Sequence, residues 1–424
     1  MKRDIYAKDR LCYILEETFN YFVIIMISGS YLAKLTTTLG FSDSLTAILT
    51  AFVNLGACAQ VVSVAFFKKG MVKRRLTAMF TFSQLLFTLL YVVPFFPVPG
   101  QWRTAAFAVL LLAGHLVLNV ALAPRTNWYM SFVDNGKRGI FTAKKEAVSL
   151  VTGIVFQFAL SAVIDVFEAK GNLKGAFVVC GIVILAISVG HTLSLIFTKD
   201  REVPESSGSF FGEVQSVLAD KSIRPLFVVA AIWAVGSSLS IPFYGTYTIK
   251  ELGFSMSYIA VMSVLSAVSR IVASVWLGKY ADKYSFAKML GLSYTLAALS
   301  FAVAAFMGPE NGYYLYPIYT CLHAASLGGT NSAAINLIFD YVRPEKRTVS
   351  LSMHKGVYGL VGFLTATVVT PLLNYIQAEG NRFLGVPVYA QQVLSALAFA
   401  VTMLAVLYLH KAVMKLRPVK TEQE

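Results

Sequence analysis

The chain has 424 residues, of which 57% are apolar and only 14% are charged, and its mean hydropathy is +0.66. About a quarter of the residues in an ordinary soluble domain are charged, so this composition excludes a soluble protein. The net charge of +14 fits a membrane protein whose basic loops face anionic lipid headgroups, and we expect no nucleic-acid partner.

Apolar segments of about 20 residues, long enough to cross a bilayer as helices, recur along the whole chain. They predict an all-α integral membrane protein with twelve transmembrane helices. The chain opens with the polar segment MKRDIYAKDR and runs directly into the first span, so we expect that span to act as its own insertion signal. The predicted spans are 11–33, 44–66, 76–95, 104–133, 139–165, 174–198, 223–249, 255–277, 287–307, 313–340, 350–376 and 389–411.

Basic residues are distributed unequally between the two ends of these spans. Most of the 36 Lys and Arg residues fall on the side that carries the two termini. The positive-inside rule therefore predicts a multi-pass protein of the cell membrane with both termini in the cytoplasm. The basic residues expected on the opposite side are Lys34, Arg103, Lys170, Lys174, Lys250 and Arg382.

One long polar stretch, Lys199–Ser222, divides the twelve spans into six and six. Within it, Phe211–Leu218 is expected to form a short amphipathic helix. We predict three parts of the chain: an N-terminal six-helix bundle at 1–198, a cytoplasmic linker at 199–222 and a C-terminal six-helix bundle at 223–424.

An internal repeat relates the two halves. The segment Phe132–Gly153 aligns with Tyr341–Gly362, and in both an apolar helix ends in a basic loop before the next apolar helix begins. The repeat spans about half of the chain and superposes the alternation of polar and apolar segments on both sides. It indicates two pseudosymmetric bundles, an arrangement typical of membrane carriers.

The segment GKYADKYS at 278–285 resembles the Gly-x-x-x-Asp-Arg/Lys-x-Gly loop of the major facilitator superfamily. With this motif and the six-plus-six arrangement of its spans, the chain resembles bacterial transporters of this family over essentially its whole length. The resemblance implies a gating role for Asp282, flanked by Gly278 and Lys283. Ser285 replaces the last glycine of the motif, and the corresponding loop FFKKGMVKRR between spans 2 and 3 has no Asp.

Charged and amide side chains inside the spans are the main candidates for a substrate site, because each costs a few kcal/mol to place in a membrane. Glu16, Glu17 and Asn20 lie in the first span, and Arg125 lies at a similar depth in the fourth. The resemblance places both spans beside a central cavity, so we expect an ion pair between them. This pair either faces the substrate path or braces the structure.

Two histidines occupy nearly equivalent positions in the halves. His115 has Asn119 one turn further along the fourth span, and His323 has Asn331 two turns further along the tenth. A neutral histidine can relay protons near physiological pH, or it can simply bond to a neighbouring helix. Both interpretations remain open, and the two pairs are candidate substrate-binding residues.

The seventh span carries aromatic residues around a proline. Pro242 predicts a kink in the helix, and Trp233 and Tyr244 are candidates for stacking on a ring of the substrate. The alternative is that these rings only pack against neighbouring helices.

Several classes of protein are excluded by what the sequence lacks. It has no phosphate-binding Gly-x-x-x-x-Gly-Lys-Ser/Thr loop and no hydrolase motif, so we predict neither an ATPase nor an enzyme. Its four cysteines are too scattered for a metal site, and we expect no metal and no cofactor.

The sequence thus favours a monomeric secondary active transporter for a small polar or anionic organic solute, working by alternating access, with protons as one candidate source of energy. Membrane lipids are its other expected partners. A multidrug efflux carrier and a non-transporting receptor or lipid-handling protein on the same scaffold are the alternatives.

Overall fold

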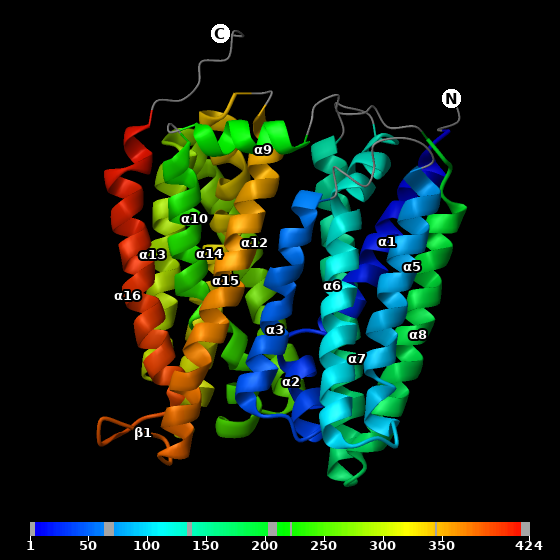
Figure 1. Ribbon diagram of the computed structural model, residues 1–424, viewed down its shortest axis with the longest axis vertical. Helices are drawn as coiled ribbons and strands as arrows, with labels where there is room; N and C mark the ends of the chain where they lie inside the picture. The colour runs from blue at the N-terminus through cyan, green and yellow to red at the C-terminus, as the bar shows by residue number, and fades with distance from the viewer. Residues whose placement is uncertain are drawn as a thin grey trace. The chain divides into compact units, whose positions relative to one another are not determined.

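The computed structural model of the chain describes residues 5–62, 72–133, 138–201, 210–220, 223–343 and 346–416, and nearly all of its elements are helices (Figure 1). The predicted amphipathic helix of the polar stretch is present as α9 (Phe210–Ala219). The helices before it are α1 (Ala7–Met26), α2 (Gly29–Thr38), α3 (Asp43–Cys58), η1 (Ala59–Val62), α5 (Val72–Leu90), η2 (Val93–Phe95), α6 (Gly100–Met130), α7 (Arg138–Ala169) and α8 (Leu173–Phe197).

The second half continues the same pattern of long helices. A short antiparallel hairpin, β1 (Arg382–Phe383) and β2 (Val386–Pro387), connects its last two long helices. The helices are α10 (Arg224–Ser238), η4 (Ile241–Phe243), α11 (Tyr244–Thr246), η5 (Tyr247–Glu251), α12 (Met256–Lys283), α13 (Phe286–Ala305), α14 (Gly312–Tyr341), α15 (Arg347–Ala378), α16 (Ala390–Lys411) and η7 (Val413–Lys415).

The helices account for the twelve predicted crossings in chain order. Within the described residues, nine helical segments are long and apolar enough to cross a membrane, and the bent pair α1–α2 adds a tenth. The remaining two are α5, which begins with the basic residues Lys73, Arg74 and Arg75, and α14, a helix of 30 residues with many polar side chains.

Two of the crossings are irregular. The axis bends by 44° between α1 and α2, where Gly29 has a φ of +53° that a regular helix cannot contain. In the seventh crossing, the α-helix ends before Pro242, where a kink is predicted, and the chain continues through the 3₁₀ turn η4 and α11 to the π-helix η5. Proline has no N–H to continue the helical hydrogen bonds.

The chain divides into two compact units. The first comprises Met1–Ser42, Leu55–Ser207 and Ser255–Ala260, and the second comprises Asp43–Asn54, Gly208–Phe254 and Val261–Glu424. Each unit therefore includes a short segment from the other half of the sequence. The beginning of α3 belongs to the second unit, and the first turn of α12 belongs to the first unit.

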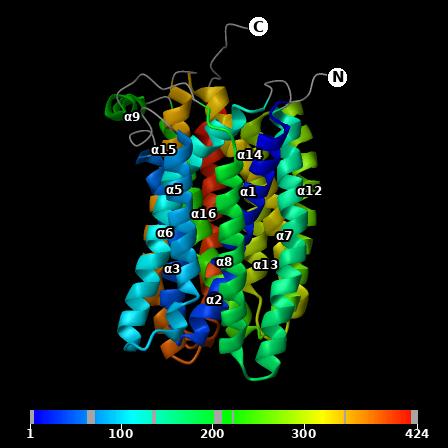
Figure 2. The ribbon, with the colours of Figure 1, turned by 90° about the vertical axis from the view of Figure 1, so that its right-hand side faces the viewer.

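In the first unit, α8 packs beside α1 and α5 (Figure 2), and α5 also packs against α6. Large aromatic side chains fill the space between these helices, including Trp128 and Phe80, which are fully buried. Tyr13 of α1 stacks on Tyr129 of α6 with ring centroids 4.2 Å apart. This packing fixes the facing sides of α1, α6 and α8.

In the second unit, α13 packs against α14 and α16, and α10 packs against α15 and α16. One apolar cluster brings the beginning of α3 into this unit, because Ala47 packs with Phe243 of η4, Leu373 of α15 and Leu394 of α16. Buried apolar contacts therefore anchor the N-terminal part of α3 in the second unit.

Candidate functional site

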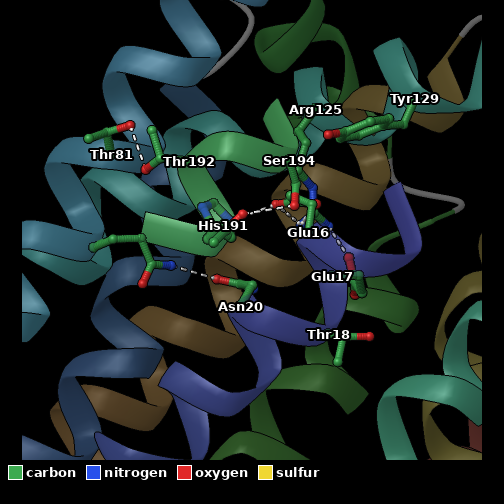
Figure 3. A network of polar contacts seen from close by, with 12 residues as sticks. Glu16, Glu17, Thr18, Asn20, Thr81, Arg125, Tyr129, His191, Thr192 and Ser194 are labelled. Carbon is green, nitrogen blue, oxygen red and sulfur yellow. Dashed lines mark hydrogen bonds and ion pairs between the residues drawn. The ribbon is translucent and has the colours of Figure 1, made fainter. Parts of the chain in front are cut away.

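The most extensive polar contacts of the first unit surround the middle of α1 (Figure 3). Glu16 and Glu17 are adjacent, and Tyr13 and Asn20 each lie three or four residues from them, so the four side chains share one face of the helix. Glu16 is completely buried, whereas the side chain of Glu17 is 26% exposed. This face points toward α6 and α8.

The predicted ion pair between α1 and α6 is confirmed. Nη1 of Arg125 donates to both carboxylate oxygens of Glu16, at 3.0 and 3.1 Å, and Nη2 donates to Oε2 of Glu17 at 2.7 Å. The side chain of Arg125 is only 4% exposed. One guanidinium group therefore pairs with two neighbouring carboxylates inside the bundle, and these hydrogen bonds are of the strong, charge-assisted kind.

His191 of α8 is a member of this site that the sequence analysis did not select. Its Nε2 lies 2.9 Å from Oε1 of Glu16, and both side chains are completely buried. An ionised carboxylate can only accept hydrogen bonds, so Nε2 carries a hydrogen in this contact. The Nδ1 atom of His191 has no hydrogen-bond partner among the described residues.

Lys145 of α7 completes the charged cluster. Its Nζ lies 3.2 Å from Oε1 of Glu17, so Glu17 bridges Lys145 and Arg125. The residue is 6% exposed, and the sequence analysis did not select it. The carboxylates of Glu16 and Glu17 and the cations of Arg125 and Lys145 give the cluster a net charge of zero as long as His191 is neutral.

Aromatic rings enclose the charged cluster. The guanidinium carbon of Arg125 lies 5.5 Å from the ring centroid of Phe80 and 5.8 Å from that of Tyr13. The ammonium group of Lys145 lies 4.7 Å from the Tyr13 ring, and the Phe80 ring is also 5.5 Å from the imidazole of His191. Such contacts stabilise cations, and the apolar surroundings strengthen each charge–charge interaction.

Asn20 lies one turn further along α1, where its Oδ1 accepts a hydrogen bond from Nε2 of the buried Gln84 of α5 at 3.3 Å. The Oε1 atom of Gln84 has no partner among the described residues. The α1 face thus continues from a charged region into a region of amide side chains.

His115 and Asn119 lie on α6 beside the end of α3. Oδ1 of Asn119 accepts a hydrogen bond from Gln60 of η1 at 2.9 Å, and the His115 ring meets the Phe87 ring edge to face at 5.2 Å. A Cβ added to Gly56 of α3 would lie 2.8 Å from Cβ of His115, so the two helices approach closely here. No hydrogen bond or ion pair among the described residues joins this pair to Glu16.

In the second unit, the predicted aromatic candidates stack on other rings. Trp233 stacks on Tyr294 at a centroid distance of 4.7 Å, and Tyr244 stacks on Tyr319 at 4.5 Å. Tyr319 also stacks on His323, at 5.5 Å, so Tyr244 and His323 share a neighbour that the sequence analysis did not select. Their role in binding a solute stays a prediction.

The Tyr244 hydroxyl group belongs to a buried polar cluster. It lies 3.2 Å from the hydroxyl of Ser395, which is 2.9 Å from that of Ser240, and Gln391 donates to Ser240 at 2.8 Å. Asn331 is different, because it is exposed on α14. Within the part of the chain that the structure describes, no hydrogen bond connects it to His323 or to this cluster.

The motif at 278–285 joins α12 to α13. Asp282 is exposed and has no hydrogen bond or ion pair among the described residues, Gly278 lies inside α12, and Nζ of Lys283 lies 5.3 Å from the ring centroid of Tyr284. Ser285, which replaces the last glycine of the motif, caps α13 by accepting a hydrogen bond from the backbone N–H of Lys288 at 3.2 Å. The gating role of Asp282 stays a prediction.

Comparison with known families identifies this helical arrangement. The family model of the Major Facilitator Superfamily matches residues 17–366, which is most of the chain. The chain belongs to the major facilitator superfamily. The predicted family and the predicted fold class, twelve transmembrane helices in two six-helix bundles, are thereby confirmed.

Solved structures of superfamily transporters share this fold. A mutant of the nucleoside transporter NupG has a TM-score of 0.74 at 12% identity, and the match covers 95% of this chain and 99% of that chain. An auto-inhibited peptide transporter of the POT family has a TM-score of 0.72 at 11% identity and covers 98% of both chains. A bacterial metal transporter has a TM-score of 0.66 at 13% identity, with coverages of 98% and 100%.

Identities this low establish the fold alone, and the solutes of these three transporters differ. Among curated protein sequences, none matches this chain significantly. The solute must therefore be argued from the chemistry of this chain's own site.

Proposed function

We propose that this superfamily member is a secondary active transporter that carries a small polar or anionic organic solute across the cell membrane by alternating access, driven by protons. The observation that supports this most is the buried Glu16 carboxylate, which is shared between Arg125 and His191. Arginine keeps its charge at any working pH, whereas histidine side chains in general change charge near neutrality. In the proposed cycle, His191 is the residue that binds the coupled proton.

The preference for an anionic group follows from the position of Glu17. Its partly exposed carboxylate occupies a place between the buried cations Arg125 and Lys145. A carboxylate or phosphate of the solute that displaces Glu17 would meet both cations, with Asn20 and Gln84 offering amide contacts one turn away. A lipophilic cation would meet repulsion from the same pair.

In the proposed cycle, residues 1–198 and 223–424 rock as two bundles around this site, and 199–222 is the cytoplasmic linker. The repeat that relates the two halves supports this division. We propose that the protein works as a monomer in contact with membrane lipids.

The function is tested by transport into vesicles that contain the purified protein and hold an inward proton gradient. Small carboxylates and phosphorylated solutes should accumulate from a panel that also includes neutral sugars and lipophilic cations. With one proton for each monovalent anion, a difference of one pH unit supports about tenfold accumulation. A protonophore should abolish it. Movement of lipophilic cations alone would favour a multidrug efflux carrier, and no movement of any solute would favour a non-transporting receptor.

The proposed orientation has both termini and the linker in the cytoplasm, as the distribution of basic residues predicts. Reporter enzymes fused at Gly208 and after Arg417, which both lie outside the described residues, should be active only on the cytoplasmic side. A fusion at Gly171, in the turn between α7 and α8, is the matched control and should report the opposite side. A cytoplasmic signal from all three fusions would contradict this topology.

A further inference from the structure

An open groove of about 540 Å³ lies on the surface of the first unit, where the beginning of α5 meets the end of α8. The two helices pack side by side (Figure 2). The hydroxyl groups of Thr81 and Thr192 form a hydrogen bond between them at 3.1 Å (Figure 3), and Thr81 also lines the groove. The charged cluster around Glu16 contributes no residue to this groove, so the groove is a separate feature of the unit.

Three charged side chains line the groove at the ends of the two helices. Nζ of Lys73 donates a hydrogen bond to the carbonyl of Ile196, in the last turn of α8, at 2.8 Å. An ammonium group has three N–H donors, so two of them remain for another acceptor. Arg74 and Asp200 are exposed, and neither has a hydrogen bond or ion pair among the described residues. Together the three side chains give this end of the groove a net charge of +1.

The rest of the groove is largely apolar. Phe82 and Leu85 of α5 and Ile196 of α8 line it, and all three are exposed. Both helices cross the membrane, so these side chains contact lipid tails. Twelve residues separate Lys73 from Leu85, which is about 18 Å along a helix. This length is close to that of the acyl chains of one leaflet, because the whole hydrocarbon core is about 30 Å thick.

We propose that this groove binds one phospholipid whose headgroup carries a single negative charge. Its phosphate lies between Lys73 and Arg74, and an acyl chain follows Phe82 and Leu85 along α5. A soluble phosphate ion would contact the two cations but would leave the apolar part of the groove uncovered, whereas a lipid covers both. Asp200 reduces the net charge to +1, which matches a headgroup with one negative charge. Basic pockets at the ends of membrane spans attract anionic headgroups.

The site is tested by fluorescence quenching in vesicles of phosphatidylglycerol and phosphatidylcholine that contain the purified protein. Leu193 is exposed on α8, three residues before Ile196, so a label on Leu193→Cys lies beside the groove. The four native cysteines are replaced by serine. Bromine on the acyl chains of one lipid at a time quenches the label when that lipid is adjacent. Phosphatidylglycerol should be preferred about fivefold, as expected for one net charge.

Substitutions of the charged residues should change this preference in opposite directions. Lys73→Gln and Arg74→Gln should each reduce it to about one, whereas Asp200→Asn should raise it to about 25-fold, since each charge contributes about fivefold. Lys73→Arg keeps the charge and should keep the preference. Lys174→Gln is the matched control, because it removes one positive charge at the other end of α8 and should leave the preference unchanged.

A second label separates the groove from a general attraction of anionic lipid to a basic protein. Ile182 is exposed on the same face of α8 as Leu193, three turns further from the groove, and a label on Ile182→Cys should show no preference. Equal preference at the two labels, or an unchanged preference in Lys73→Gln and Arg74→Gln, would overturn the proposal.

Two further outcomes also decide the proposal. A lower preference in Asp200→Asn would contradict the assigned charge balance. Loss of the preference in millimolar inorganic phosphate at constant ionic strength would assign the two cations to a soluble anion instead of a lipid. The measurement needs no solute and no proton gradient, so the lipid site stands or falls independently of the proposed transport.

Discussion

Arg125→Ala is expected to abolish transport and to destabilise the protein strongly. The substitution leaves Glu16 fully buried without its permanent cation. Removal of one partner of a buried ion pair costs about 3–5 kcal/mol in soluble proteins. Thermal unfolding of the purified protein and transport in vesicles measure the two effects. Arg270→Ala is the matched control, because Arg270 also lies within a membrane-spanning helix but is exposed, and it should unfold like the parent.

The structure also identifies the partner whose removal restores folding. Glu16→Ala combined with Arg125→Ala leaves Glu17 paired with Lys145, so this double variant should recover most of the lost stability. Glu17→Ala combined with Arg125→Ala leaves Glu16 buried beside His191 alone and should recover little. Equal recovery by the two doubles would contradict the geometry of the cluster.

Transport by the restored double variant separates the two interpretations of the pair. If Arg125 only braces α1 against α6, the folded double variant should transport. If Arg125 binds an anionic group of the solute, the double variant should fold and remain inactive, which is the result we expect. Transport by Arg125→Ala alone at the parent rate would contradict both interpretations.

The Glu16–Arg125 pair was predictable because opposite charges occur at matching depths in the first and fourth spans, where each is costly unless paired. His191 was not predicted, although it also lies within a span. α8 is apolar around most of its circumference, so the periodicity of its sequence does not show which side faces α1. The histidines that the sequence indicated were His115 and His323, because they occupy similar positions in the two halves.

The ion pair of Asp43 with Lys250, and the hydrogen bonds that Asp165 accepts from the backbone N–H groups of Met256 and Ser257, were hidden from the sequence for a different reason. Both residues lie at the ends of predicted spans, where carboxylates ordinarily contact water, so their presence signals nothing unusual. Their partners are 207 and 91 residues away in the chain. Such contacts depend on how α3 and α12 pack at their first turns, and apolar periodicity carries no information about that packing.

His191→Gln is expected to separate solute movement from proton coupling. The glutamine amide can still donate a hydrogen bond to Glu16, but it cannot gain a proton. The groups that face His191 are Glu16 on α1, Arg125 beyond it on α6 and the Phe80 ring on α5, and Glu17 and Lys145 complete the cluster. With His191 neutral, two carboxylates balance two cations. In the proposed cycle, a proton bound by His191 gives the cluster one net positive charge, which favours an anionic solute.

The variant should therefore fold and exchange labelled solute across the membrane at equal pH on both sides. It should lose the accumulation of about tenfold that a difference of one pH unit supports in the parent. His410→Gln is the matched control. Among the described residues, His410 forms a hydrogen bond only with the backbone carbonyl of Val406 in its own helix, so this variant should accumulate solute like the parent. If His191→Gln accumulates solute with the pH dependence of the parent, the proton is bound elsewhere, and the charged cluster then binds solute or braces the helices without coupling the two.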